Sequence, residues 1–176
     1  MTEAAPTTRG ADGSKARIFV GVLSAVLLLD VITKLAIQRT FRLYEQVHVI
    51  GDFFRLTYIH NPGAAFGFYL GEHSRVIFLA LSLVALVALL AMYWVTPAMN
   101  RVRLTAIALV CGGAVGNLID RVRSHQGVVD FLDMGIGENL RWPVFNVADV
   151  AVTIGAILLA LSLWQEEHGE EPEGGG

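Results

Sequence analysis

The chain of 176 residues is 54% hydrophobic and 16% charged, a composition that excludes an ordinary soluble domain and is typical of membrane proteins with several spans. The formal net charge of -3 is small, so we expect no nucleic acid partner. Cys111 is the only cysteine, which excludes a disulfide within the chain.

Four apolar runs, each near the length needed to cross a bilayer, are the main feature of the chain. At about 1.5 Å rise per residue, each covers roughly 24–30 Å of hydrocarbon. The first run follows basic residues, as a secretory signal does, but it is longer and carries Asp30 and Lys34, so we expect an uncleaved span. The runs are Ile18–Ile37, Val76–Val95, Leu104–Ile119 and Val147–Trp164.

The ends of the chain differ in composition from the part between them. Residues 1–16 and the acidic stretch 166–176 contain too few apolar residues to order themselves, so we expect two disordered tails. Residues 17–165 are then one domain. The sequence predicts an all-α membrane protein of four transmembrane helices with a small β-element.

Two connections between the runs are long. Within Gln38–Ser74, the stretches Val47–Ile50 and Phe53–Ile59 partly alternate apolar and polar residues around Gly51-Asp52, which predicts a hairpin or small sheet on the membrane surface. The connection Val122–Phe145 mixes glycines and a proline with apolar residues, so we expect a loop or a partly interfacial element rather than a fifth span.

Four spans bring the first and third connections out on the same face of the membrane. Most polar residues in or beside the runs then lie at that face, which indicates an enzyme site or a transport path. Basic residues flank both faces, so counting charges leaves the orientation open. The polar residues are Asp30, Lys34, Asn61, Asn117, Asp120, Arg121, Asp130, Asn146 and Asp149.

Asp30 and Lys34 are spaced to share one helix face. Charged side chains in a span need a partner or a water-lined cavity. The pair is therefore either a salt bridge that fixes the first helix or a substrate contact, and the sequence leaves both open.

Asp149 also allows two interpretations. Asn146 followed by Asp149 has the spacing of a helix cap, which alone explains both residues. However, Asp130 is expected on the same face, and two carboxylates at the edge of the hydrocarbon would share a proton. Asp133 is a rival to Asp130, and Asp120 is a third candidate, although its neighbour Arg121 suggests a paired interfacial charge.

A carboxylate pair can hydrolyse a peptide without a metal or a nucleophilic side chain. One acid takes a proton from the attacking water, and the other protonates the carbonyl oxygen and later the leaving amine. The sequence contains neither the serine-elbow motif nor the paired-histidine zinc motif, so we expect no metal and no cofactor.

Five motifs, in this order, resemble those of bacterial lipoprotein signal peptidase, signal peptidase II. They are Asp30–Lys34 (DVITK), Asn61–Gly67 (NPGAAFG), Gly112–Arg121 (GGAVGNLIDR), Val128–Phe131 (VVDF) and Phe145–Asp149 (FNVAD). The resemblance covers roughly Ile18 to Trp164 and implies an aspartic endopeptidase that removes the signal peptide of a prolipoprotein at the bond before a diacylglyceryl-cysteine.

The resemblance also implies roles for single residues. Asp130 and Asp149 would be the catalytic pair, with Asp30 and Lys34 supporting the site. The residues lining the substrate site would be Asn61, Gly113, Asn117, Arg121, Asn146 and Ala148.

The same resemblance predicts location and partners. It places the chain in the bacterial cytoplasmic (inner) membrane, with both termini cytoplasmic and with the site and the β-element near the extracytoplasmic face. The expected partners are the diacylglyceryl-modified prolipoprotein and membrane lipid, and we expect a monomer. The alternatives are a small transporter or proton-coupled carrier, which predicts polar residues continuing to the opposite face, and a structural membrane subunit.

Overall fold

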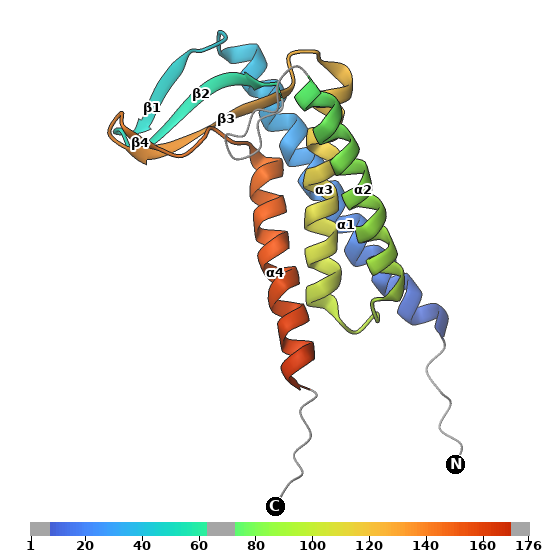
Figure 1. The fold of residues 1–176 in the computed structure, drawn as a ribbon. Helices are drawn as coiled ribbons and strands as arrows, with labels where there is room; N and C mark the ends of the chain where they lie inside the picture. The colour runs from blue at the N-terminus through green and yellow to red at the C-terminus, as the bar shows by residue number, and fades with distance from the viewer. Residues whose placement is uncertain (1–7, 63–72, 170–176) are drawn as a thin grey trace, which may run out of the picture.

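Four long helices carry a small antiparallel sheet across one end in the computed structural model, which describes residues 8–62 and 73–169 (Figure 1). The helices are α1 (Thr8–Thr40), α2 (Ser74–Val95), α3 (Arg101–Arg123) and α4 (Val147–Gly169). The strands are β1 (Gln46–Ile50), β2 (Phe54–Asn61), β3 (Val128–Ile136) and β4 (Leu140–Arg141). All four helices are long and apolar enough to cross a membrane, which confirms the predicted fold class.

The first and last helices are longer than their apolar runs. α1 begins at Thr8, inside the stretch 1–16 that we expected to be a tail, and α4 continues to Gly169, past the expected boundary at residue 165. Once an apolar run has formed helix, each added residue gains a backbone hydrogen bond, so polar residues can prolong it. Residues 1–7 and 170–176 lie outside the described residues, so their disorder stays a prediction.

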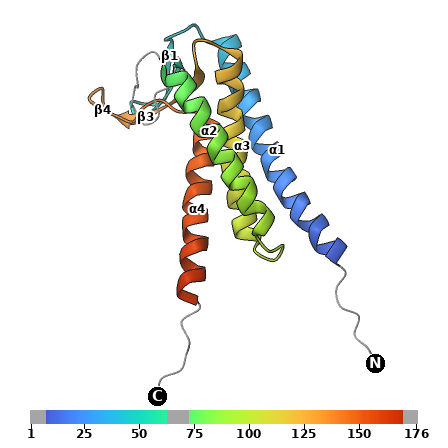
Figure 2. The ribbon, with the colours of Figure 1, turned by 45° about the vertical axis from the view of Figure 1, so that its right-hand side comes forward.

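α3 is the central helix of the bundle and contacts α1, α2 and α4 (Figure 2). In the most apolar stretch of α3, 56% of the residues are buried, whereas 6% are buried in the corresponding stretch of α2. Small residues bring α3 and α4 close together: a Cβ at Gly155 would lie 2.8 Å from the Ala106 carbonyl oxygen, and one at Gly113 would overlap the Ala148 carbonyl oxygen. Close backbone approach at small residues is the usual way in which membrane helices pack.

The sheet joins the two long connections on one face, as the span count predicted. Its strand order is β1-β2-β3-β4, with β1 and β2 from the first connection and β3 and β4 from the third. A buried cluster of Ile37, Tyr58, Val129 and Phe131 fixes the sheet to the end of α1. The sheet therefore holds β3 against the ends of the helices.

Val122–Phe145, expected to be a loop or a partly interfacial element, forms the two strands β3 and β4 in its central part, which its sequence did not predict as strands. The first four residues of β3, Val128–Phe131, are all buried. A strand buried on both faces loses the apolar-polar alternation by which strands are recognised in a sequence.

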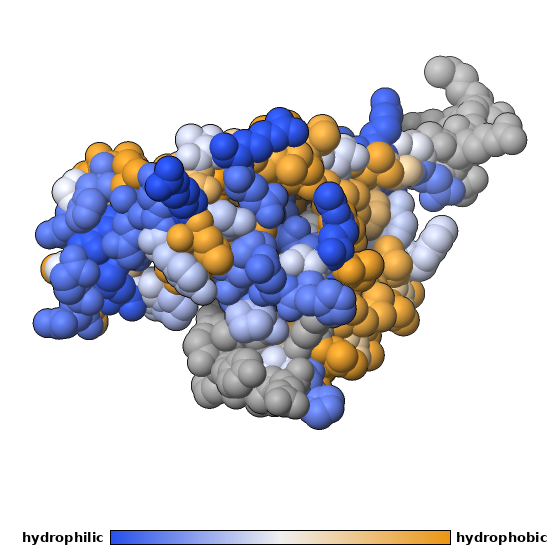
Figure 3. Space-filling view, turned by 90° about the horizontal axis from the view of Figure 1, so that it is seen from above, coloured by the Kyte–Doolittle hydropathy of each residue, from blue (hydrophilic) through white to orange (hydrophobic). Residues whose placement is uncertain are grey.

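The two ends of the molecule differ in surface character. Viewed from the end that carries the sheet, much of the surface is hydrophilic, and hydrophobic residues gather along the flank of the bundle (Figure 3). The ends of α1 and α4 remote from the sheet both lie at the opposite end of the molecule, apart from each other (Figure 1). The polar residues of interest are therefore concentrated at the sheet end.

The α3–α4 contact gives a first prediction. Gly113→Ala places a methyl group against the Ala148 carbonyl oxygen and 2.7 Å from Val152 Cγ2, so we expect a loss of about 1–3 kcal/mol in the free energy of unfolding. Thermal unfolding in detergent measures it. Gly21→Ala is the control, because a Cβ there meets nothing within 4 Å. Equal melting temperatures for the two variants would contradict the prediction.

Candidate active site

Asp130 and Asp149 lie on different elements and line the same cavity, of about 880 Å³. Asp130 is on β3, opposite Ile59 of β2, and Asp149 is in the first turn of α4. The cavity lies among α2, α3, α4 and the sheet, and it has apolar walls from the helices and a polar end at the two carboxylates. Side chains from separate parts of the sequence thus converge on one space.

The first turn of α4 holds Asp149 by a reciprocal cap. Asn146 Oδ1 accepts a hydrogen bond from the Asp149 backbone N–H at 3.0 Å, and Asp149 Oδ2 accepts one from the Asn146 backbone N–H at 3.1 Å. The capping interpretation of these residues is therefore confirmed. The same bonds fix the direction of the Asp149 carboxylate.

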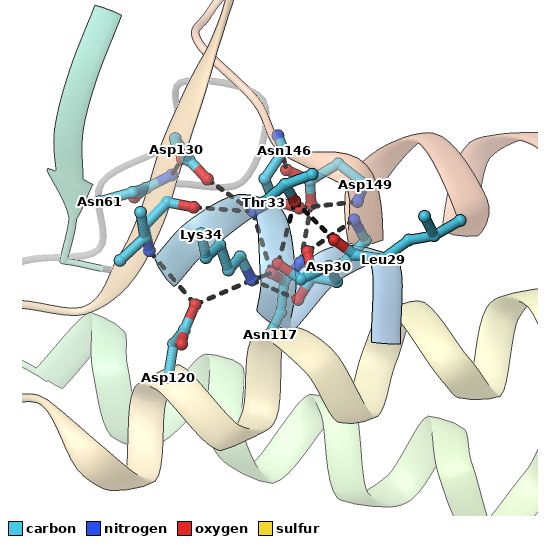
Figure 4. Close-up of polar contacts among 12 residues, drawn as sticks. Leu29, Asp30, Thr33, Lys34, Asn61, Asn117, Asp120, Asp130, Asn146 and Asp149 are labelled. Atoms are coloured by element: carbon cyan, nitrogen blue, oxygen red, sulfur yellow. Dashed lines mark hydrogen bonds and ion pairs between the residues drawn. The ribbon is translucent and has the colours of Figure 1, made fainter. Parts of the chain in front are cut away.

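Three asparagine amides connect the two carboxylates (Figure 4). Asn146 Nδ2 donates to Asp130 Oδ1 at 2.7 Å, and Asn61 Nδ2 donates to Asp130 Oδ2 at 2.9 Å. Asn117 Nδ2 donates to Asp149 Oδ1 at 2.8 Å. Asn146 Nδ2 also donates to Asn117 Oδ1, at 3.0 Å, so one amide links the partners of both acids.

Lys34 fixes the orientation of the Asn117 amide. Its Nζ lies 3.0 Å from Asn117 Oδ1, 2.7 Å from Asp30 Oδ2 and 2.8 Å from Asp120 Oδ2. Because the Asn117 oxygen faces the Lys34 and Asn146 donors, its NH2 group must face Asp149. Of the two interpretations left open for Asp30 and Lys34, the structure shows the salt bridge, and Lys34 also reaches α3.

Asp30 connects α1 to the start of α4. It is fully buried, and its Oδ1 accepts a hydrogen bond from the Ala148 backbone N–H at 3.0 Å. A Cβ at Gly116 would lie 2.6 Å from Asp30 Oδ2, so glycine there makes room for the carboxylate. Asp30 thus supports the site from behind and also occupies a free N–H of the helix start.

The electrostatics of the site favour a proton on Asp130. Burial, and then the charge of Asp149, raise the pKa of Asp130 to about 7, against the opposing effects of Asn61, Asn146 and Lys34. Asp130 is 1% exposed. An acid with this pKa holds a proton through much of the neutral range and can donate it.

The residues implied to line the substrate site fall into two groups. Asn61, Asn117 and Arg121 line the cavity, and the Arg121 guanidinium also lies over the Phe78 ring. Within the described part of the chain, Gly113, Asn146 and Ala148 do not line it, because they are buried in the contacts of α3, α4 and β3. The turn residues Gly63–Gly67 lie outside the described residues.

The rival acids have other partners. Asp133 Oδ1 accepts from Arg141 Nε at 2.8 Å and its Oδ2 accepts from the Thr57 hydroxyl at 2.8 Å, away from the cavity lining. Asp120 pairs with Lys34 and accepts from the Val129 backbone N–H. The charge of Asp120 also acts on Arg121, so Asp120 is a structural partner of two cations.

Sequence reasoning missed Trp142 and Phe78, both of which line the cavity. In the sequence, Phe78 is one more apolar residue of a span. Trp142 follows β4 in a segment that we expected to be a loop or a partly interfacial element. The sequence feature that could have drawn attention to Trp142 is its position directly before Pro143.

The arrangement belongs to the class of membrane-embedded hydrolases that use two acids. Two carboxylates face one space, one of them with a raised pKa, and a cationic side chain lies beside them. Among residues 8–62 and 73–169, no three His, Cys, Asp or Glu side chains are grouped so that they could hold a metal ion.

Comparison with known proteins agrees with this class. The family model described as signal peptidase (SPase) II matches residues 22–165. The lipoprotein signal peptidase of Moorella thermoacetica is 46% identical over 84% of this chain and 94% of its own length. That of Paraburkholderia phytofirmans is 42% identical over 92% of each chain. A solved bacterial membrane enzyme structure, obtained by the in meso method at 2.3 Å resolution, superposes with a TM-score of 0.77 at 31% identity, over 90% of this chain and 94% of its own.

The chain belongs to the signal peptidase II family, the lipoprotein signal peptidases, which are aspartic peptidases of bacterial membranes. It therefore removes signal peptides from prolipoproteins, and the predicted family and activity are confirmed. The transporter and structural alternatives are set aside. Farther from the sheet than Asn117 and Arg121, the buried residues of α3 include the apolar Leu104, Ala106, Ile107 and Ala108. A continuous polar path across the membrane therefore does not run along this helix.

Proposed function

We propose that Asp130 and Asp149 are the catalytic pair of this lipoprotein signal peptidase. The observation that carries the proposal is the shared cavity, in which burial and then the charge of Asp149 raise the pKa of Asp130. Asp130 is then the acid that starts with the proton, and Asp149 is the base. Each oxygen of Asp149 accepts one N–H, from Asn117 and from the Asn146 backbone, so the carboxylate is held in a fixed direction.

Hydrolysis follows from these two protonation states. Asp149 takes a proton from water as the water oxygen attacks the scissile carbonyl carbon, and Asp130 gives its proton to the carbonyl oxygen. When the C–N bond breaks, Asp149 passes its proton to the leaving nitrogen and Asp130 recovers one from the hydroxyl of the intermediate. Arg121, in the same cavity, is placed to bind a carbonyl oxygen of the substrate.

The other polar and small residues of the motifs take positioning roles in this proposal. Asn146 and Asn117 orient the carboxylates, and Lys34 and Asp30 hold those amides and the start of α4. Gly113 and Ala148 permit the close α3–α4 contact. The structural and the functional interpretations of these residues thus rest on the same contacts.

The substrate is proposed to enter sideways from the bilayer. The cavity has walls on α2 and α4, including Leu81, Ala85, Val150 and Ile154, and apolar walls suit the hydrophobic part of a signal peptide. The scissile bond, before a diacylglyceryl-cysteine, then meets the acids at the end of the spans. We expect the enzyme to act as a monomer, because one chain supplies every residue used here.

We propose the orientation in which the sheet and the acids face the extracytoplasmic side, while the opposite ends of α1 and α4 face the cytoplasm. Signal peptides are removed after export, so the acids must lie near the side to which the substrate is exported.

The catalytic assignment is tested by conservative substitution. Asp130→Asn and Asp149→Asn each lower cleavage of a lipid-modified prolipoprotein at least about 100-fold, because each removes one proton-transfer group. Gel-shift assays on purified protein measure the rate, and thermal unfolding checks the fold. Asp133→Asn, a buried aspartate on the same strand but outside the cavity, retains cleavage. Wild-type rates in either of the first two variants would remove that residue from catalysis.

The proton on Asp130 gives a pH dependence. Activity falls as pH rises through the pKa of Asp130, about 7, because the acid is then lost. The Lys34 charge lowers this pKa, so Lys34→Met raises it and moves the alkaline fall of kcat/KM to higher pH. Lys15→Met is the control, since Lys15 is a buried lysine of α1 that bonds the Trp94 carbonyl instead. An unmoved alkaline limb in Lys34→Met would show that Lys34 has only a structural role.

Orientation has a separate test. In a Cys111→Ala background, a membrane-impermeant maleimide added to intact spheroplasts labels Gln126→Cys, at the sheet end, and leaves Met99→Cys, at the other end, unlabelled until the cells are lysed. Both positions are exposed. The reverse labelling pattern would overturn the proposed orientation and leave the catalytic assignment untouched.

A further inference from the structure

Trp142 lies at the mouth of the cavity and has no role in the chemistry above. It lines the same cavity as Asp130 and Asp149, yet 63% of its surface is exposed. It belongs to the segment Trp142–Phe145 between β4 and α4, which forms the wall on the sheet side. A large aromatic side chain left open beside a catalytic cavity is available for contact with a ligand.

The backbone that carries Trp142 is firmly held. Its N–H donates to the Met134 carbonyl oxygen at 2.8 Å, and Phe145, three residues later, exchanges hydrogen bonds with Leu132 at 3.0 and 2.7 Å. The preceding Arg141 donates to Asp133 at 2.8 Å and to the Asp52 carbonyl oxygen at 2.9 Å. The backbone position of Trp142 is therefore fixed, so binding has to order only the rotamer of the indole.

The depth of Trp142 in the membrane distinguishes two parts of the substrate. α4, one of the candidate spans, begins at Val147, so in the proposed orientation Trp142 lies just outside the span, at the depth of the lipid head groups and esters. The apolar part of a signal peptide must lie deeper, between α2 and α4, where Ala85 and Ile154 line the cavity. A glyceryl group with its ester bonds lies at the interface and matches the position of the indole.

We propose that Trp142 binds the acylated glyceryl group on the substrate cysteine and thereby determines specificity for lipid-modified precursors. This inference rests on the proposed function, because the same cavity must hold the scissile bond. The indole covers the glyceryl and upper acyl carbons, while Arg121 and the two acids hold the peptide. The cavity, at about 880 Å³, is near the upper end for ligand pockets, so it has room for more than a peptide segment.

Cleavage kinetics test the proposal. Trp142→Ala raises KM for the diacylglyceryl-modified precursor about tenfold with kcat little changed, as loss of one buried aromatic contact would. Trp142→Phe restores most of the affinity. The matched control is Leu140→Ala, because Leu140 is 69% exposed on the same hairpin but does not line the cavity. A wild-type KM in Trp142→Ala, or an equal rise in Leu140→Ala, would overturn the proposal.

Inhibition separates the lipid from the peptide. An S-diacylglyceryl-N-acetylcysteine amide competes with the substrate in the wild type, and its inhibition constant rises about tenfold in Trp142→Ala. The same precursor peptide without its lipid inhibits both enzymes with equal, weak affinity. If Trp142→Ala weakens the lipid-free peptide as much as the lipid probe, Trp142 contacts the peptide and the proposal is wrong.

Failure of the proposed function would look different. Were the cavity not the active site, Asp130→Asn would still cleave, whatever Trp142→Ala did. If the acids are catalytic but Trp142 does not bind the lipid, both aspartate variants are inactive and Trp142→Ala has the KM of the wild type. The two results are thus read independently.

Discussion

The site depends on the buried amide of Asn117, which stands between a lysine and an acid. Its oxygen faces Lys34 and Asn146, so its NH2 group faces Asp149. The surrounding cluster contains the acids Asp30, Asp120, Asp130 and Asp149 and the cations Lys34 and Arg121. With more acids than cations in a poorly solvated region, holding one proton lowers the electrostatic cost, and burial together with the charge of Asp149 favours a proton on Asp130.

Structural and catalytic requirements are met by the same bonds at the start of α4. A helix start needs acceptors for its free N–H groups, and Asn146, Asp149 and Asp30 supply them. Fixing those acceptors also fixes the carboxylate of Asp149. The cap and the catalytic acid were competing interpretations of the sequence, and the geometry makes them compatible, since Asp149 Oδ1 remains directed to the cavity side with Asn117.

Hydropathy, span count and motif order were sufficient to predict the four helices, the shared face and the convergence of Asp130 with Asp149. These features follow from chain length, membrane thickness and an even number of spans. The strand β3 was missed because burial on both faces removed its alternation. Asn146 and Ala148, which the motif resemblance assigns to the substrate site, are fully buried, and that assignment stays a prediction. Which way a side chain points depends on packing between distant segments, which no local pattern contains.

Close packing on one side of α3 leaves space on the other. Gly113 and Gly155 bring α3 and α4 together, while α2, the least buried span, meets α3 through larger side chains such as Leu86, Met92 and Tyr93 around Ile107 and Cys111. The cavity lies in this less closely packed region, lined by side chains of α2, α3 and α4. An active site that must admit a membrane-bound substrate needs one rigid wall to hold its acids and one open side toward lipid, and this distribution of small and large residues provides both.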